Sequence, residues 1–118
     1  MKRKIYEILE AKDLLEDMIY GMGEFSMAAS YELYVMQDQL NLVEDFFFKQ
    51  LYSLVDEANI SENKMTEEET KVYNLIIESE IIINPFRMTF EEFMGETNLE
   101  LNDEDKRTFG KLFDKKFD

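Results

Sequence analysis

Residues 26–58 read SMAASYELYVMQDQLNLVEDFFFKQLYSLVDEA and contain neither glycine nor proline. Ser26 is a good N-cap residue, and the chain after it can form one helix of up to about thirty residues, roughly 45 Å long. Apolar residues recur at near-heptad spacing along one face of that helix, as expected of a buried element. The face comprises Leu33, Met36, Leu40, Val43, Phe47, Leu51 and Leu54. This pattern predicts one long helix at the centre of the fold.

Three consecutive phenylalanines, Phe46, Phe47 and Phe48, lie within the same stretch. Successive helical residues point about 100° apart, so the three rings cannot all be buried against one neighbour. Val35 and Leu42 also lie off the main apolar face. The helix is therefore predicted either to contact several neighbours or to present Phe46–Phe48 as the interface of an oligomer. Monomer and homodimer both remain open.

Capping boxes mark two further helix starts. Thr66 and Glu69 have the spacing at which each side chain bonds the other residue's backbone N–H, and Thr89 with Glu92 repeats it. The helix dipole favours carboxylates in the first turn, which accounts locally for the run TEEET at residues 66–70.

The remaining pattern predicts helices over about residues 3–21, from Thr66 towards Pro85, and after Asn102. Five residues are expected to form the buried stripe of the second of these, namely Val72, Leu75, Ile76, Ile82 and Ile83. The β-branched residues at 76–83 leave a short strand open as the alternative. The fold class is thus predicted as all-α. We expect a single domain, residues 1–118, built as a compact bundle of four or five helices around the long one, with a candidate C-terminal helical hairpin at 86–118.

Charge is the strongest compositional signal. The 118 residues include 27 acids and 13 bases, for a net charge of −14. Residues 23–85 hold 13 of the acids and only three bases, Lys49, Lys64 and Lys71. Direct binding to nucleic acid or to an anionic membrane requires clusters of Lys and Arg, so neither is expected. The balance favours a basic protein partner, or solubility alone.

The chain lacks the residues on which most enzymes and metal sites depend. Without histidine or cysteine there is no imidazole or thiolate ligand, and the Glu-x-x-His motif of di-iron bundles cannot occur. Arg107 occupies the position where a calcium loop needs glycine. We therefore expect a non-enzymatic protein with no catalytic, cofactor-binding or metal-binding residues. Charged residues interrupt the N-terminal segment and no run is long enough to span a membrane, so a cytoplasmic location is expected.

The leading functional hypothesis uses the acids of the long helix and its neighbours. Asp38, Asp45 and Asp56 are seven and eleven residues apart, so on one continuous helix they would project from nearly the same side. Glu68, Glu78 and Glu80 would extend this acidic face on the next helix. Such a row can imitate nucleic-acid phosphates, although solvated helices carry similar rows.

The sequence is accordingly interpreted as an inhibitor that occupies the basic, nucleic-acid-binding groove of a partner such as a nuclease. Phage proteins of the anti-restriction and anti-CRISPR type share its size and charge, which is an analogy rather than shared sequence.

Two alternatives remain. One is an oligomeric helical adaptor that uses the Phe-rich long helix. The other is a small helix-turn-helix accessory of transcription or replication, because the stretch DKRTFGKLF at 105–113 loosely resembles the second helix of winged-helix domains in phage replication proteins. Its bases would be Lys106, Arg107, Lys111, Lys115 and Lys116. Residues 86–118 nevertheless hold nine acids against six bases, which opposes phosphate binding.

Overall fold

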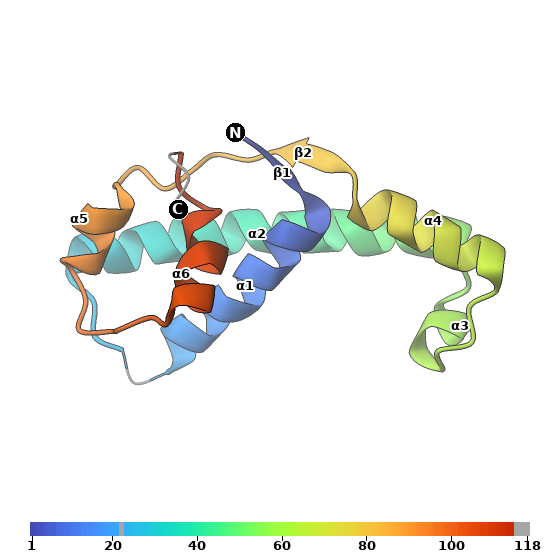
Figure 1. The fold of residues 1–118 in the computed structure, drawn as a ribbon, viewed down its shortest axis with the longest axis horizontal. Helices are drawn as coiled ribbons and strands as arrows, with labels where there is room; N and C mark the ends of the chain where they lie inside the picture. Colours follow the sequence, from blue (N-terminus) through green and yellow to red (C-terminus); the bar gives the residue numbers. More distant parts are fainter. Residues whose placement is uncertain (22, 115–118) are drawn as a thin grey trace.

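The computed structural model describes residues 1–21 and 23–114. Its longest element is α2, Met27–Leu54, whose 28 residues span about 42 Å of the molecule's 47 Å length (Figure 1). The Ser26 hydroxyl accepts a hydrogen bond from the Ala29 N–H at 3.1 Å, as predicted for the N-cap. At the other end Val55 is extended, so α2 stops there although neither glycine nor proline is present.

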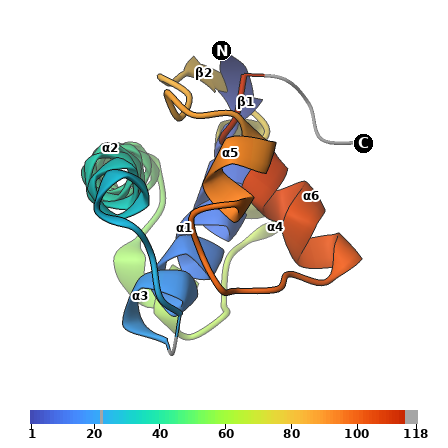
Figure 2. The ribbon, with the colours of Figure 1, turned by 90° about the vertical axis from the view of Figure 1, so that its left-hand side faces the viewer.

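The other elements pack mainly on one side of α2. Helix α1, Ile5–Tyr20, and helix α4, Glu67–Ile77, both contact it. The short helices are α3, Glu57–Ser61, α5, Phe90–Met94, and α6, Asp103–Gly110, of which α6 packs on α1. Seen along α2, the helices α1, α5 and α6 lie on the same side of it (Figure 2). The all-α class with a long central helix is confirmed, and the described helices leave the opposite face of α2 uncovered.

A cluster of phenylalanines holds the C-terminal third together. Phe86, Phe93, Phe109 and Phe113 are each at most 5% exposed. Their ring centroids lie between 4.7 and 6.2 Å apart, in tilted or edge-to-face pairs. This cluster joins the main core between α1 and α2. A second, smaller core lies around Phe47 and Leu51, where α4 packs on α2.

A two-stranded sheet decides between the alternatives for residues 76–83. Strand β1, Lys2–Lys4, pairs antiparallel with β2, Glu80–Ile82, in the register that places Lys2 opposite Ile82. Helix α4 ends at Ile77, and the chain then alternates as a strand does. Ile82 is therefore 74% exposed while Ile83 is buried. The prediction that Ile82 is part of a buried helical stripe is wrong.

Leu75 is a second correction, because it is 73% exposed. It lies about 100° from Ile76 on α4, and the α4 side chains that pack against the core around Phe47 and Leu51 are Val72, Tyr73, Ile76 and Ile77. A helix covered on one side leaves such a residue in solvent.

Both capping boxes form as predicted. The Thr66 hydroxyl accepts from the Glu69 N–H at 3.1 Å, and Glu69 Oε1 accepts from the Thr66 N–H at 3.0 Å. Thr89 and Glu92 repeat the arrangement. Glu69 also accepts from the Asn59 side chain, so this residue of the TEEET run ties α3 to α4 as well. The hydrogen bond from the Thr66 backbone lowers the pKa of Glu69.

Candidate functional site

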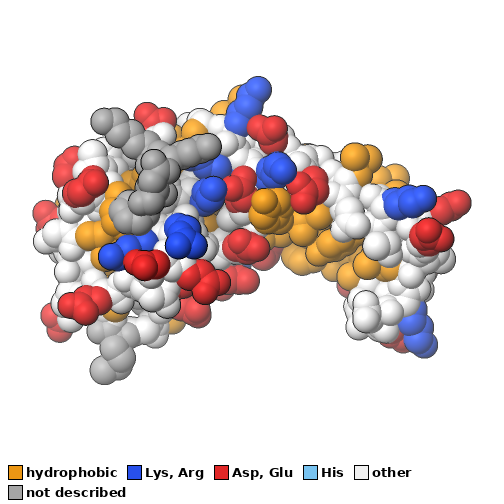
Figure 3. Space-filling model, viewed as in Figure 1, with side chains coloured by type: hydrophobic (Ala, Val, Ile, Leu, Met, Phe, Trp, Pro, Cys, Tyr) orange, Lys and Arg blue, Asp and Glu red, His pale blue; other side chains and the backbone are white. Residues whose placement is uncertain are grey.

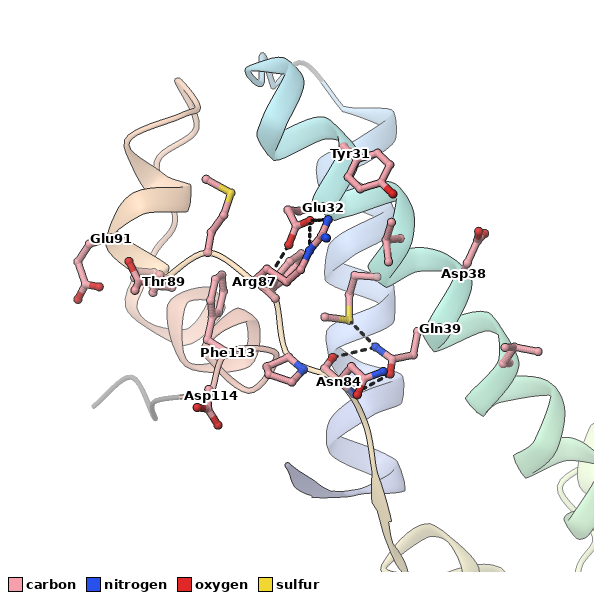
Figure 4. Close-up of a pocket in the computed structure, with 17 residues that line it drawn as sticks. Tyr31, Glu32, Asp38, Gln39, Asn84, Arg87, Thr89, Glu91, Phe113 and Asp114 are labelled. Atoms are coloured by element: carbon pink, nitrogen blue, oxygen red, sulfur yellow. Dashed lines mark hydrogen bonds and ion pairs between the residues drawn. The ribbon is translucent and has the colours of Figure 1, made fainter.

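A groove lies between α2 and the segment 84–91, which runs alongside it (Figure 4). Its volume is about 1210 Å³, and it is open to solvent. Tyr31, Val35 and Leu42 line it from α2, and Pro85, Met88 and Phe90 line it from segment 84–91. We call this concavity the α2 groove.

One polar contact fixes segment 84–91 against the middle of α2. The Gln39 side-chain amide donates to the Asn84 carbonyl at 2.9 Å and accepts from the Asn84 N–H at 2.7 Å. A single side chain thus satisfies both backbone groups of Asn84, as a paired strand would. Pro85 keeps the preceding residue, Asn84, extended, and an extended residue can offer its N–H and its carbonyl to the same side chain.

A second polar contact lies one heptad away, at Glu32. This carboxylate accepts from the Arg87 N–H at 2.8 Å and from the Arg87 guanidinium at 3.0 and 2.6 Å. Glu32 is only 7% exposed, whereas the Arg87 side chain is 70% exposed and lies 5.4 Å from the centre of the Tyr31 ring. The two contacts at positions 32 and 39 thus fix the backbone at Asn84 and Arg87 to α2.

The bonds from Arg87 lower the pKa of Glu32, although its burial acts in the opposite direction. The carboxylate therefore stays ionised near neutral pH and is not a proton donor there. Its role is to anchor segment 84–91 to α2.

This anchor predicts a pH-dependent stability. Since the folded-state pKa lies below the ordinary value of 4.5, Glu32 stabilises the fold above about pH 4.5, and that contribution is lost as pH falls through the folded-state pKa. Glu32→Gln should lower the free energy of unfolding by about 1–3 kcal/mol at pH 7. The difference from the parent should shrink below pH 4.5 in urea titrations. The control Glu91→Gln, at an exposed position of α5, should change the free energy of unfolding by less than about 0.5 kcal/mol. A pH-independent difference would contradict this role.

Carboxylates surround the apolar lining. Asp38 on α2, Glu91 on α5 and Asp114 at the end of the described chain are all exposed and lie at the groove's edges (Figure 4). No ion pair involving any of the three is formed among the described residues. Among the lining residues that the structure describes, the only cation is Arg87, which is paired with Glu32. The groove is thus apolar inside and acidic at its rim.

The predicted acidic face is divided among several elements. Asp38 and Asp45 lie on the uncovered side of α2, and both are exposed. Asp56 is a correction: α2 ends at Leu54, and the Asp56 carboxylate instead caps α3 by accepting from the Ala58 N–H at 2.9 Å. Aspartate is a preferred N-cap residue, and at position 56 it begins α3 instead of continuing α2.

The three glutamates lie on the α4–β2 unit. Glu68 is exposed in the first turn of α4. Glu78 pairs with Lys4 at 2.9 Å, and Glu80 lies opposite Lys4 in the sheet register. Lys4 therefore offsets part of the charge there, and the continuous row of six carboxylates predicted from sequence does not form.

The three phenylalanines separate as their spacing requires. Phe47 is 2% exposed and packs edge-to-face on Tyr73 of α4 at 6.0 Å, so its assignment to an oligomer interface is wrong. Phe46 and Phe48 are exposed, and the Phe48 ring stacks on Tyr52 at 5.5 Å.

Much of the positive charge is used inside the fold. Lys12, itself buried, pairs with Glu16 and Glu44, and Lys111 pairs with Glu7 at 3.1 Å. The face formed by α1 and α6 shows Lys and Arg interspersed among the acids (Figure 3). On the outward side of α2, by contrast, the exposed carboxylates Asp38 and Asp45 have no cationic partner among residues 1–21 and 23–114.

The C-terminal bases do not assemble a phosphate site in the described chain. Helix α6 carries three acids in its first turn, and Lys111 is held by Glu7. Lys115 and Lys116 lie outside the described residues.

No group of three or more His, Cys, Asp or Glu side chains in the described ranges is placed to hold a metal ion. Within those same ranges, no helix combines the length and apolar character that a membrane span needs.

Sequence reasoning missed the groove because residues 84–91 reach α2 only in the tertiary structure. One signal could have indicated it. Glu32 lies between Ala29, Leu33 and Met36 on the buried face of α2, and a carboxylate there needs a partner.

Comparison with protein families, characterised proteins and solved structures gives no match for this chain.

Proposed function

We propose that this chain is a non-enzymatic inhibitor that binds the basic, nucleic-acid-binding groove of a partner protein through the outward side of α2. The observation that carries the proposal is that Asp38 and Asp45, both exposed on α2, form no ion pair among the described residues. A net charge of −14 destabilises the free protein through repulsion among its own charges, and binding to a basic surface relieves that repulsion.

The spacing of the two carboxylates suits this role. Seven helical residues separate Asp38 from Asp45, which is a rise of about 10.5 Å. Three phosphate steps along one strand of a DNA duplex rise about 10 Å. A rigid helix therefore holds two negative charges at a separation that a basic groove already accommodates.

A competition assay tests the proposal. Purified restriction and CRISPR nucleases would each be loaded with a fluorescent DNA duplex and titrated with the protein, while release of the duplex is followed by anisotropy. We expect displacement from at least one nuclease at about 50 mM salt, and a loss of apparent affinity of tenfold or more at about 200 mM salt. Displacement that does not depend on salt, or none from any nuclease, would contradict the proposal.

Self-association is the second candidate function, and it is favoured by the exposed apolar side chains at the C-terminal half of α2. Phe46, Phe48, Tyr52 and Leu54 are between 37% and 62% exposed. Two copies of net charge −14 repel each other, so a homodimer should strengthen as salt rises. Sedimentation at low and high salt therefore separates the two functions, because binding to a basic partner weakens over the same range.

A further inference from the structure

We infer that the α2 groove binds one amphipathic, basic helix of the partner, whose apolar side chains enter the groove while its Lys or Arg residues meet the acidic rim. This inference rests on the proposed function in one respect, namely that the partner is a basic protein. To the proposed function it adds apolar contacts in the α2 groove and a helical form for the bound segment of the partner.

The dimensions of the groove suit a helix. Its volume, about 1210 Å³, exceeds the roughly 300–1,000 Å³ of typical small-molecule pockets. Tyr31, Val35 and Leu42 line it along α2 with 57%, 44% and 71% of their surfaces exposed. From residue 31 to residue 42 the helix rises about 16.5 Å, which is three turns. A partner helix of similar length can place apolar side chains at one-turn intervals along this wall.

The backbone of residues 83–87 excludes the other common way to bind a peptide, in which the peptide adds a strand. The Ile83 N–H donates to the Met1 carbonyl, and the Asn84 N–H donates to Gln39. Pro85 has no N–H, and the Phe86 N–H donates to the Leu112 carbonyl at 2.9 Å. The Arg87 N–H is taken by Glu32. Five consecutive positions thus offer no donor for a strand, so side-chain contacts must provide the affinity.

Charge determines which helix fits. The rim acids Asp38, Glu91 and Asp114 form no ion pair among the described residues, whereas the exposed Arg87 is paired with Glu32 and lies beside the Tyr31 ring. A bound helix with Lys or Arg beside its apolar stripe meets these carboxylates at the edge, where like-charged partners are rejected. A second copy of this chain carries a net charge of −14 and fits poorly for the same reason.

The test uses a labelled peptide of about sixteen residues, with leucine at positions i, i+4, i+7 and i+11 and with lysine and alanine elsewhere. The full-length protein would be titrated into it at about 50 mM salt. A peptide of the same composition, with its leucines distributed around the helix, serves as the charge-matched control. We expect the patterned peptide to bind at least tenfold more tightly than the scrambled one.

Two double variants locate the contact. Val35→Ser with Leu42→Ser removes apolar surface from the groove wall and should weaken the patterned peptide about tenfold or more. Leu54→Ser with Leu75→Ser removes comparably exposed leucines outside the groove and should change the affinity by less than about twofold. All four positions are exposed, so circular dichroism should show unchanged helicity.

Three results would overturn the inference: no binding of the patterned peptide, equal binding of both peptides, or equal effects of the two double variants. A dimer in sedimentation that Val35→Ser with Leu42→Ser dissolves would also overturn it, because the occupant would then be a second copy. None of these results bears on displacement of DNA from a nuclease, which tests the proposed function separately.

Discussion

Replacing Phe93 with alanine should lower the free energy of unfolding by about 3–5 kcal/mol, enough to remove a large part of the stability of a domain of this size. Phe93 is 0% exposed, and its ring lies within 6.2 Å of the rings of Phe25, Phe86, Phe109 and Phe113. Alanine would leave a cavity at the point where these rings meet.

The substitution should destabilise α5 in particular, because Phe93 is the buried residue of that helix. A helix of five residues does not form by itself, so its packing holds it in place. Urea unfolding followed by circular dichroism would measure the loss. Phe48→Ala is the matched control, since that ring is 37% exposed, and it should cost clearly less. A loss below about 1.5 kcal/mol for Phe93→Ala would show that the cluster does not carry the C-terminal third.

The fold elements that local chemistry specifies were predictable from sequence. The absence of glycine and proline after Ser26 indicated α2, and the Thr66 and Thr89 capping boxes indicated the starts of α4 and α5. Each of these signals depends on residues within one or two turns of each other.

The elements that distant residues specify were not predictable. Strand β1 is the basic run Lys2–Lys4, which has no strand pattern and pairs only because β2 lies beside it. The end of α2 at Leu54 depends on Asp56 capping α3, a choice that the sequence leaves open. The α2 groove likewise depends on Asn84 and Arg87 reaching Gln39 and Glu32 across 45 and 55 residues of chain.

Reversing the charge of both Asp38 and Asp45 to lysine should lower the affinity for the basic partner about a hundredfold at low salt. Both side chains are exposed and form no ion pair among the described residues, so the change should leave the fold intact. Two like charges would then face the partner's cations across an interface, where such contacts cost several kcal/mol.

Helix α1 offers a matched control. Glu10 and Asp17 are also seven residues apart and exposed, and they lie on a different helix. Each double reversal to lysine changes the net charge by +4, from −14 to −10. The two variants thus differ in where the charge is changed but not in how much.

Displacement of fluorescent DNA from a nuclease by these two variants, side by side at about 50 mM salt, tests the account most directly. If the outward side of α2 binds the partner, Asp38→Lys with Asp45→Lys should need about a hundredfold more protein than the parent for half-displacement. Glu10→Lys with Asp17→Lys should stay within about threefold of the parent. Equal effects of the two variants would mean that only the total charge matters, and that result would contradict a binding face on α2.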